Sequence, residues 1–417
     1  MTPRPSENAA RYAIDGIAPA RVIRPTSVGN LRETLTALSS EGSKAIVWGG
    51  GTRMALGNPP AAYDVALDLA GLDRVVAHNP GDLTITVEAG ITIAALQAVL
   101  AQHGQFLAID PPLPERATVG GTLAVGTSGP LKWQYGNPRD LVIGMSIAQP
   151  DGTLTKSGGQ VVKNVSGYDM ARLHIGGMGT LGVIAQASFK LAPLPVREAT
   201  LLARYENASQ ALDAALDIFR GHVIPSALAV FDPASAKRLA LPNASWHIAA
   251  RLGGRALSLE RQVKECNAAC KAHTPSSVEA LDDAAAKSLW RKLADFGWDD
   301  ATRPVASARV SLLPGKVKEF VAALGDPDCG TVSHPAHGTI LLNWYAESAG
   351  LADSLTGARA LAQRLGGIAV FEQCPPSLKK TLDVWGGVGE TLAIMRRMKE
   401  QYDPSGTLNP GRFAGGI

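Results

Sequence analysis

Cysteine and long apolar runs are scarce in this chain of 417 residues, and each absence excludes a class of protein. Four cysteines are too few for a disulfide framework, so we expect a reducing compartment, the cytoplasm. No stretch of about 18 uninterrupted apolar residues occurs, so we expect no membrane-spanning helix. The first 25 residues contain no apolar core of the kind a secretory signal needs, so we expect no such signal.

A charge imbalance is also absent. The chain has 40 Lys and Arg against 37 Asp and Glu, a formal net charge of +3, and no long basic run. This balance argues against nucleic acid as the main partner. Hydrophobic residues make up 46% and charged residues 18%, which excludes a mainly disordered chain. At about 150 residues per domain, the length predicts two or three domains.

Glycine is plentiful and unevenly placed. The chain has 44 glycines, of which 25 lie in residues 1–192, whereas all four cysteines lie in the second part. Glycine is favoured in tight loops that need a positive φ, and where a backbone must approach a ligand closely. The first part is therefore the candidate ligand domain. Its boundary is expected near Lys190–Val196, where two prolines follow an apolar run.

The order of predicted elements indicates an α+β fold without regular βαβ repetition. Apolar residues at helical spacing predict helices, and period-two alternation or short apolar runs predict strands. The predicted helices cover 27–41, 92–103, 208–220 and 258–273. The predicted strands cover 45–48, 65–69, 83–88, 141–149, 153–155, 183–191, 306–312 and 339–345.

Three glycine-rich segments carry the candidate chemistry. Gly49–Met54 follows a predicted strand, and successive backbone N–H groups in such a loop can bind an anion such as a pyrophosphate. Ala117–Thr122, continuing to Gly126–Gly129, is predicted as a second loop, rich in hydroxyls and free of acidic residues. An acid-free loop of this kind suits a phosphate better than a cation. The alternative for either loop is an ordinary surface turn.

The third segment, Gly176–Gly182, contains the letters G-x-G-x-x-G at 177–182. A dinucleotide-binding Rossmann turn requires a helix directly after these glycines and an acidic residue about 20 positions later. Here a strand pattern follows instead, so we reject that interpretation. The sequence also has no G-x-x-x-x-G-K-[ST], and a P-loop nucleotidase is unsupported.

Taken in order, these motifs resemble the vanillyl-alcohol-oxidase (PCMH-type) FAD flavoproteins. The motifs are GGGTRM, ATVGGTLAVGTSGP, VVKNVSGYDMARLHIGGMGTLGVI and the terminal DPSGTLNPGRF. Within that family, VVKNVSGYD at 161–169 and the pair SGP and RDLVIG look most like the E subunits of bacterial glycolate oxidases. The resemblance implies a PCMH-type two-part FAD-binding domain over 1–195, an α+β cap over 196–385 and a segment, 386–417, that returns to the FAD domain.

The resemblance also implies which residues contact FAD. The first two segments would hold the pyrophosphate, the third would pass along the flavin, and the NPGR motif would bring the C-terminus back. The implied cofactor-binding residues are Gly49, Gly50, Gly51, Thr52, Thr118, Gly120, Gly121, Ser128, Gly129, Gly179, Gly182, Val183, Ile184, Asn409 and Arg412. Several family members attach FAD through a His beside the first loop. This sequence has Thr52-Arg53 there, so we expect non-covalent FAD.

The catalytic histidines of related 2-hydroxy-acid dehydrogenases are incomplete here. Their motif resembles H-x-G-D-G-N-L-H, followed later by E-H-G, and serves to hold a metal and remove a proton. The matching stretch is His334–Leu341, which ends in Leu rather than His, and Gln373 replaces the later His. Pro335 and Gly338 argue against a helix that would pair the two remaining histidines. We therefore expect no metal site and assign no catalytic residue.

Three functions remain open. The first is the FAD-binding subunit of a glycolate or D-lactate oxidising complex, in which a sister flavin subunit acts on the small 2-hydroxy acid and an iron–sulfur subunit carries electrons onward. The second is a stand-alone FAD-dependent D-2-hydroxy-acid dehydrogenase, which the lost histidines disfavour. The third is a flavin-free assembly protein, which the intact glycine segments disfavour. For the first we expect a cytoplasmic protein with at most peripheral contact with the inner face of the membrane.

Overall fold

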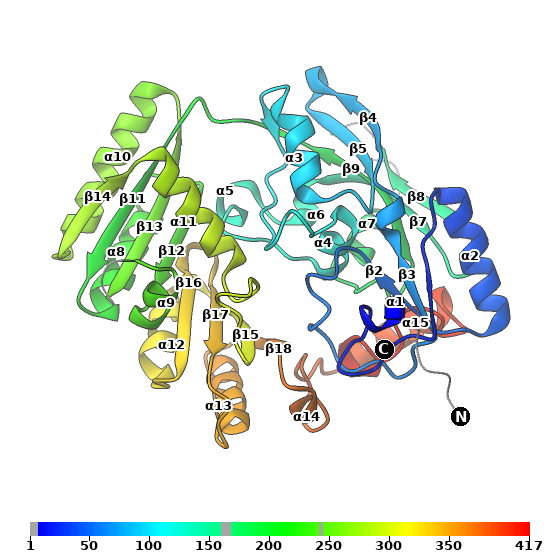
Figure 1. Ribbon diagram of the computed structural model, residues 1–417. Coiled ribbons are helices and arrows are strands. Elements are labelled where there is room, and N and C mark those ends of the chain that lie inside the picture. Colours follow the sequence, from blue (N-terminus) through cyan, green and yellow to red (C-terminus); the bar gives the residue numbers. More distant parts are fainter. Residues whose placement is uncertain (1–6, 160–167, 242–244) are drawn as a thin grey trace. The chain divides into compact units, whose positions relative to one another are not determined.

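The computed structural model describes residues 7–159, 168–241 and 245–417, which form two compact units (Figure 1). The first unit contains the chain up to Ser128, Gly136–Leu194 and Pro376–Ile417, and the second contains Gly129–Tyr135 and Pro195–Pro375. The chain returns to the first unit at Pro376. Both units combine helices with sheets, which confirms the α+β class.

The first unit is built around two main sheets. A parallel sheet has the order β1-β3-β2, and an antiparallel sheet has the order β4-β5-β9-β7-β8. Their strands are β1 Arg21–Ile23, β2 Ala45–Trp48, β3 Val65–Asp68, β4 Val75–Asn79, β5 Thr84–Glu88, β7 Val142–Ala148, β8 Leu154–Gly158 and β9 Val183–Lys190, with the small antiparallel pair β6 Gln105–Phe106 and β10 Ala192–Pro193.

The helices of the first unit are mostly short. They are α1 Glu7–Ala10, α2 Val28–Glu41, α3 Ile93–Ala101, α4 Val119–Val125, α6 Pro138–Leu141, α7 Ala171–His174, α14 Pro376–Lys379 and α15 Thr391–Tyr402, with the 3-10 turns η1 Leu69–Gly71, η2 Pro80–Asp82 and η5 Ala414–Gly416.

Helix α2 shows how the local pattern dictates structure. The Ser27 hydroxyl accepts a hydrogen bond from the Asn30 amide over 3.1 Å and caps the N-terminus. Gly42 ends the helix in the left-handed region, with φ 71°. Between them Leu31 and Leu35 are fully buried in a cluster with Val183 of β9. The predicted helix over 27–41 is confirmed.

The C-terminal segment runs beside β2. The Ala45 amide donates to the Thr407 carbonyl over 2.7 Å, and the Asn409 amide donates to the Ala45 carbonyl over 2.8 Å. These bonds form an isolated parallel bridge between Ala45 and Leu408. The NPGR motif at 409–412 therefore lies next to the strand that leads into the first glycine segment.

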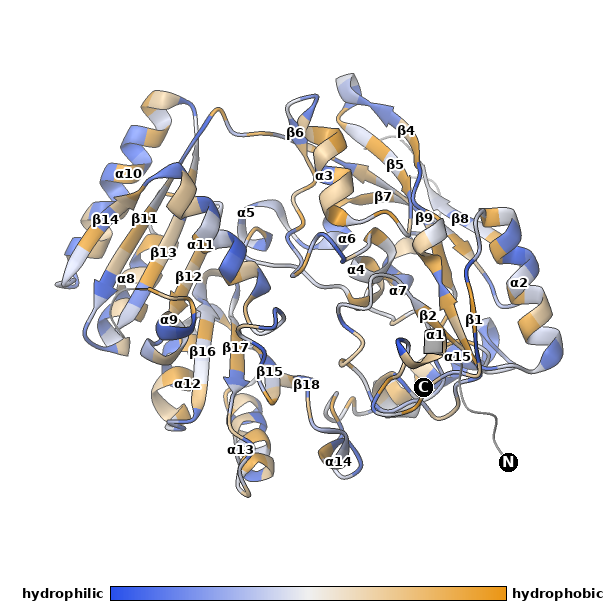
Figure 2. Cartoon of the chain, in the orientation of Figure 1, coloured by the Kyte–Doolittle hydropathy of each residue, from blue (hydrophilic) through white to orange (hydrophobic). Residues whose placement is uncertain are grey.

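The second unit has one antiparallel sheet of eight strands, in the order β14-β11-β13-β12-β16-β17-β15-β18. Figure 2 shows hydrophobic residues along β12, all of which are buried. The strands are β11 Arg197–Tyr205, β12 Ala227–Phe231, β13 Trp246–Gly254, β14 Ser277–Leu281, β15 Ala306–Ser311, β16 Cys329–His334, β17 Thr339–Trp344 and β18 Ile368–Gln373.

Helices pack on this sheet, and one of them comes from a distant part of the chain. Helix α5, Lys132–Tyr135, lies in the 129–135 segment and contacts β12. The others are α8 Ala208–Arg220, α9 Pro233–Arg238, α10 Ala256–Lys271, α11 Asp283–Asp295, α12 Val317–Leu324 and α13 Leu351–Arg364, with 3-10 turns η3 Pro314–Lys316 and η4 Pro335–His337. Within the described ranges, no helix combines the length and apolar character needed to cross a membrane.

Candidate functional site

The first glycine segment leaves β2 and passes against the chain at Arg116–Thr118. A Cβ added at Gly49 would lie 2.2 Å from the Thr118 hydroxyl oxygen. A Cβ added at Gly50 would lie 1.6 Å from the Arg116 carbonyl oxygen. Both distances are far below van der Waals contact, so any side chain here would push the two segments apart. The sequence analysis attributed these glycines to contact with the cofactor, whereas an added Cβ would first meet the Thr118 side chain at Gly49 and the Arg116 backbone at Gly50.

The second segment is a helix rather than the predicted loop. Helix α4 begins after Thr118, whose hydroxyl accepts a hydrogen bond from the Gly121 amide over 3.2 Å. The Gly120 amide donates to the Ala89 carbonyl over 2.7 Å, and a Cβ at Gly120 would lie 2.7 Å from the Ala89 methyl carbon. The low helix propensity of the Gly-Gly pair is therefore overridden by this close packing.

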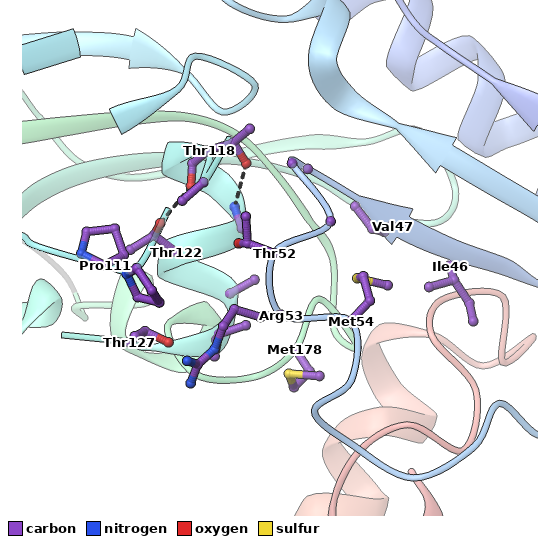
Figure 3. Close-up of a pocket in the computed structure, with 18 of the residues that line it drawn as sticks. Ile46, Val47, Thr52, Arg53, Met54, Pro111, Thr118, Thr122, Thr127 and Met178 are labelled. Atoms are coloured by element: carbon purple, nitrogen blue, oxygen red, sulfur yellow. Dashed lines mark hydrogen bonds between the residues drawn. The ribbon is translucent and has the colours of Figure 1, made fainter. Parts of the chain in front are cut away.

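Two threonines extend the polar surface of α4 (Figure 3). The Thr122 hydroxyl donates to the Thr118 carbonyl over 2.8 Å, a bond drawn as a dashed line. The Thr127 hydroxyl oxygen is buried and has no hydrogen-bond partner within the described residues. A buried hydroxyl in that state costs free energy unless a ligand supplies the partner.

Asn409 joins strand β2, which leads into the first glycine segment, to the third glycine segment. Its side-chain oxygen accepts from the Val47 amide over 2.9 Å, and its side-chain nitrogen donates to the Met178 carbonyl over 2.6 Å. A Cβ on Gly179 would lie 2.8 Å from that same nitrogen. The amide of Asn409 therefore holds protein backbone on both sides, although the residue also borders the pocket described below.

Arg412 is almost wholly buried and donates to backbone rather than outward. Its guanidinium bonds the carbonyls of Met54 over 2.8 Å and Asn58 over 2.7 Å, and also that of Leu56. Burial lowers the pKa of Arg412 to about 10, an effect that the Asp15 carboxylate opposes. Arg412 is therefore still charged at neutral pH, and its charge lies beside the pocket.

These elements enclose one pocket within the first unit (Figure 3). Of the predicted site residues, the pocket is lined by Gly49, Gly50, Gly51, Thr52, Thr118, Gly121, Asn409 and Arg412. It is not lined by Gly120, Ser128, Gly129, Gly179, Gly182, Val183 or Ile184.

Packing explains why several predicted residues lie elsewhere. Gly120 faces Ala89, while Val183 and Ile184 are buried within β9. Gly129 belongs to the 129–135 segment of the second unit. Seven of the nine residues of VVKNVSGYD, 161–167, lie outside the described residues.

The pocket also contains residues that the motifs did not identify. Arg53 and Met54 directly follow the glycines, so their position in the sequence was an available signal. Pro111 and Pro112 have no such signal, because they reach the pocket from a separate segment. Met178, at φ 54°, contributes from the third glycine segment. Figure 3 shows Arg53, Met178 and Thr127 around the same space.

The lining of the pocket suits a diphosphate group. Within the described chain, no Asp or Glu lines it, and Arg53 and Arg412 supply positive charge. Gly121 is less restricted than Gly49 and Gly50, since an added Cβ would meet only the Thr118 hydroxyl, at 3.1 Å. The unpartnered Thr127 hydroxyl adds a group able to bind a ligand. Basic side chains, glycine backbone and hydroxyls without a competing carboxylate fit a bound diphosphate.

The histidine motif lies in the second unit and is held by its own surroundings. Pro335 and Gly338 limit the motif to a single 3-10 turn, η4. Burial lowers the pKa of His334 to about 4 and that of His337 to about 2. The His337 Nε2 atom is buried and has no partner in the described part of the chain. Among residues with described positions, no group of three or more His, Cys, Asp and Glu could hold a metal ion.

The two positions where the resemblance implies histidine are occupied by side chains engaged elsewhere. Leu341 packs against an apolar cluster of the second unit. The Gln373 amide nitrogen donates to the Gly297 carbonyl over 2.6 Å. The adjacent Glu372 accepts a hydrogen bond from Arg309 over 2.9 Å. Neither Leu nor a neutral amide can accept a proton at neutral pH.

Comparison with known protein families decides the class. Residues 19–158 match the FAD binding domain family, and residues 387–413 match the C-terminal domain of FAD linked oxidases. The first match contains the glycine segment and α4, and the second contains Asn409 and Arg412. The chain is an FAD-linked oxidoreductase. FAD is its cofactor, and the expectation of a flavoprotein is confirmed.

Two relatives match different shares of this oxidoreductase. It is 26% identical to glycolate oxidase subunit GlcD of Bacillus subtilis (strain 168), over 95% of this chain and 89% of that protein. It is 35% identical to glycolate oxidase subunit GlcE of Escherichia coli (strain K12), over only 40% of this chain and 47% of that protein. The resemblance to an E subunit therefore covers part of the chain, and the finer assignment to that subunit is not supported.

Other relatives extend along nearly the whole oxidoreductase. It is 25% identical to the mitochondrial D-lactate dehydrogenase [cytochrome] of Arabidopsis thaliana, over 95% of this chain and 73% of that protein. Among solved structures, an alkyldihydroxyacetonephosphate synthase matches with a TM-score of 0.73 and 16% identity, over 94% of this chain and 76% of the other. The 4-ethylphenol oxidase of Gulosibacter chungangensis matches with a TM-score of 0.68 and 17% identity, over 94% and 88%. These structures confirm the PCMH-type fold.

Proposed function

We propose that the oxidoreductase binds one FAD non-covalently in the pocket of the first unit and takes part in oxidising a small 2-hydroxy acid to a 2-oxo acid. The observation that carries the cofactor site is the acid-free pocket in which Gly49–Met54 meets the start of α4. Bound FAD supplies the acceptor for the two electrons that leave the substrate. The named activities of the glycolate oxidase and D-lactate dehydrogenase relatives support the substrate class.

Within this proposal the protein's own residues bind and orient the cofactor. The glycine segment and Gly121 offer backbone to the diphosphate, Thr127 offers a hydroxyl, and Arg53 and Arg412 offer charge. No His, Cys or Tyr is among the described residues that line the pocket, which supports non-covalent attachment. Asn409 keeps strand β2 and the third glycine segment together through its two bonds to backbone.

We further propose that this chain is an FAD-binding subunit whose substrate chemistry depends on a sister flavin subunit, with an iron–sulfur subunit carrying electrons onward. Support comes from Leu341 and Gln373, which have no means of taking the hydroxyl proton as hydride leaves. General base catalysis contributes about 10²–10⁴ to the rate, so its loss should slow substrate oxidation by a readily measurable factor. The partial likeness to GlcE, a glycolate oxidase subunit, supports assembly into a complex.

A stand-alone FAD-dependent D-2-hydroxy-acid dehydrogenase is the second candidate. The observation that favours it is the similarity to GlcD and to D-lactate dehydrogenase over 95% of the chain. Anaerobic stopped-flow mixing of the FAD-loaded chain with glycolate or D-lactate separates the two candidates. We expect flavin bleaching by the isolated chain to be at least 100-fold slower than by the complex purified from its native source. Bleaching of the isolated chain at a matching rate would establish the second candidate instead.

A further inference from the structure

Two buried cations hold the segment that follows the first glycine loop. The Arg412 guanidinium donates to the carbonyls of Met54, Leu56 and Asn58. The ammonium of Lys379, at the end of α14, donates to the carbonyls in between, Ala55 over 2.7 Å and Gly57 over 3.2 Å. Five consecutive carbonyls, 54–58, are thus bound alternately by one guanidinium and one ammonium.

The same two cations share a carboxylate. The Lys379 ammonium donates to both Asp15 carboxylate oxygens, over 3.0 and 2.9 Å, and the Arg412 guanidinium lies 3.9 Å from Asp15. The Lys379 side chain is 1% exposed, and that of Arg412 is 2% exposed. Burying two cations is costly unless dipoles and counter-charges surround them. The five carbonyls and Asp15 provide that compensation, so the whole group is set by the fold of the first unit.

This arrangement adjoins the pocket without Lys379 entering it. Met54 and Arg412 line the pocket, whereas Lys379 does not. Lys379 is also the first charged residue after the chain returns from the second unit at Pro376. Its ammonium contacts the pocket wall through the Ala55 and Gly57 carbonyls, and it also binds Asp15.

We propose that Lys379 is a positioning residue of the cofactor site: with Arg412 it fixes the Met54–Asn58 backbone, and thereby the Gly49–Met54 wall against which FAD binds. The inference rests on the proposed position of FAD in this pocket. It extends the site to a residue that neither touches the pocket nor belongs to the glycine motifs. Without the ammonium, the Ala55 and Gly57 carbonyls lose their partner and the wall is free to shift.

The test is FAD titration of apoprotein by flavin fluorescence, with urea unfolding of the same apoproteins as the measure of folding. We expect Lys379→Met to raise the FAD Kd at least tenfold. Asp15→Asn breaks the same ion pair but leaves Lys379 bonded to both carbonyls, so it should raise the Kd less than threefold. Lys318→Met, which removes a lysine paired with Asp213 in the second unit, is the control and should leave the Kd unchanged.

The outcomes are distinct. The proposal is overturned if Lys379→Met raises the FAD Kd less than tenfold. It is also overturned if Asp15→Asn raises the Kd equally, because removing either partner of a purely structural ion pair would have the same effect. If Lys379→Met gives no folded apoprotein, Lys379→Gln replaces it under the same thresholds, since Gln is polar but one bond too short. Gly121→Asp is titrated in parallel. If only Gly121→Asp weakens binding, the cofactor site stands and this inference falls. If neither does, the proposed site itself is wrong.

Discussion

Substitutions at two glycines of the pocket should have different effects, one on the stability of the fold and the other on FAD binding. Gly50→Ala would place a methyl carbon 1.6 Å from the Arg116 carbonyl oxygen, and backbone cannot rotate away as a side chain can. Overpacking of this kind costs about 1–3 kcal/mol and occasionally more. Since the overlap is nearly half of a normal contact distance, we expect Gly50→Ala to lower the free energy of unfolding by about 3 kcal/mol.

Gly121→Asp should have little effect on the stability of the fold and should weaken FAD binding. An added Cβ at Gly121 meets only the Thr118 hydroxyl, at 3.1 Å, so the apoprotein should lose less than about 1 kcal/mol. A carboxylate beside a diphosphate repels it by about 1–4 kcal/mol at 4 Å, depending on the local dielectric. We therefore expect the FAD Kd to rise between about fivefold and a thousandfold.

Urea unfolding of the apoproteins and FAD titration separate these effects. Gly81→Ala is the matched control, because an added Cβ at Gly81, also in the first unit, has no neighbour within 4 Å. The reasoning is refuted if Gly50→Ala unfolds at the same urea concentration as Gly81→Ala. It is equally refuted if Gly121→Asp destabilises the apoprotein as much as Gly50→Ala does.

Three further outcomes are expected. Arg412→Met should lower the unfolding free energy by about 3–5 kcal/mol in urea titrations, because three carbonyls and Asp15 lose a buried charged partner; a loss below 1 kcal/mol would contradict the assigned contacts. The lowered pKa values of His334 and His337 mean that the unfolded chain binds protons below pH 6.5 before the folded chain does, so stability falls on acidification, by about 3 kcal/mol between pH 6.5 and 5. His337→Gln should remove about half of that pH dependence. An unchanged slope of unfolding free energy against pH would contradict the contribution assigned to His337. Acid precipitation should release yellow flavin into the supernatant, whereas flavin retained in the pellet would demonstrate a covalent bond.

Short sequence patterns predicted a helix or strand correctly where the residues within the segment and its tertiary contacts favour the same structure. Helix α2 was readable because its cap, its apolar face and its terminal glycine all lie within one short segment. Helix α4 was missed because two adjacent glycines disfavour a helix locally, and the reason they form one is contact with Ala89, some thirty residues earlier. The strand after Gly182 was predicted correctly, and it is what distinguishes this glycine run from a Rossmann turn.

The sequence by itself determined the class of ligand domain, because glycine, hydroxyl and acid-free composition are properties of short segments. It could not determine what each glycine contacts. A side chain at Gly49 or Gly50 would collide with the neighbouring segment Arg116–Thr118. Gly121 lines the pocket, and an added Cβ there would meet only the Thr118 hydroxyl. Only the tertiary structure brings Lys379 and Arg412 onto alternate carbonyls of 54–58, more than 300 residues away. Backbone carbonyls are identical at every position, so nothing in the sequence marks which ones a buried cation will bind.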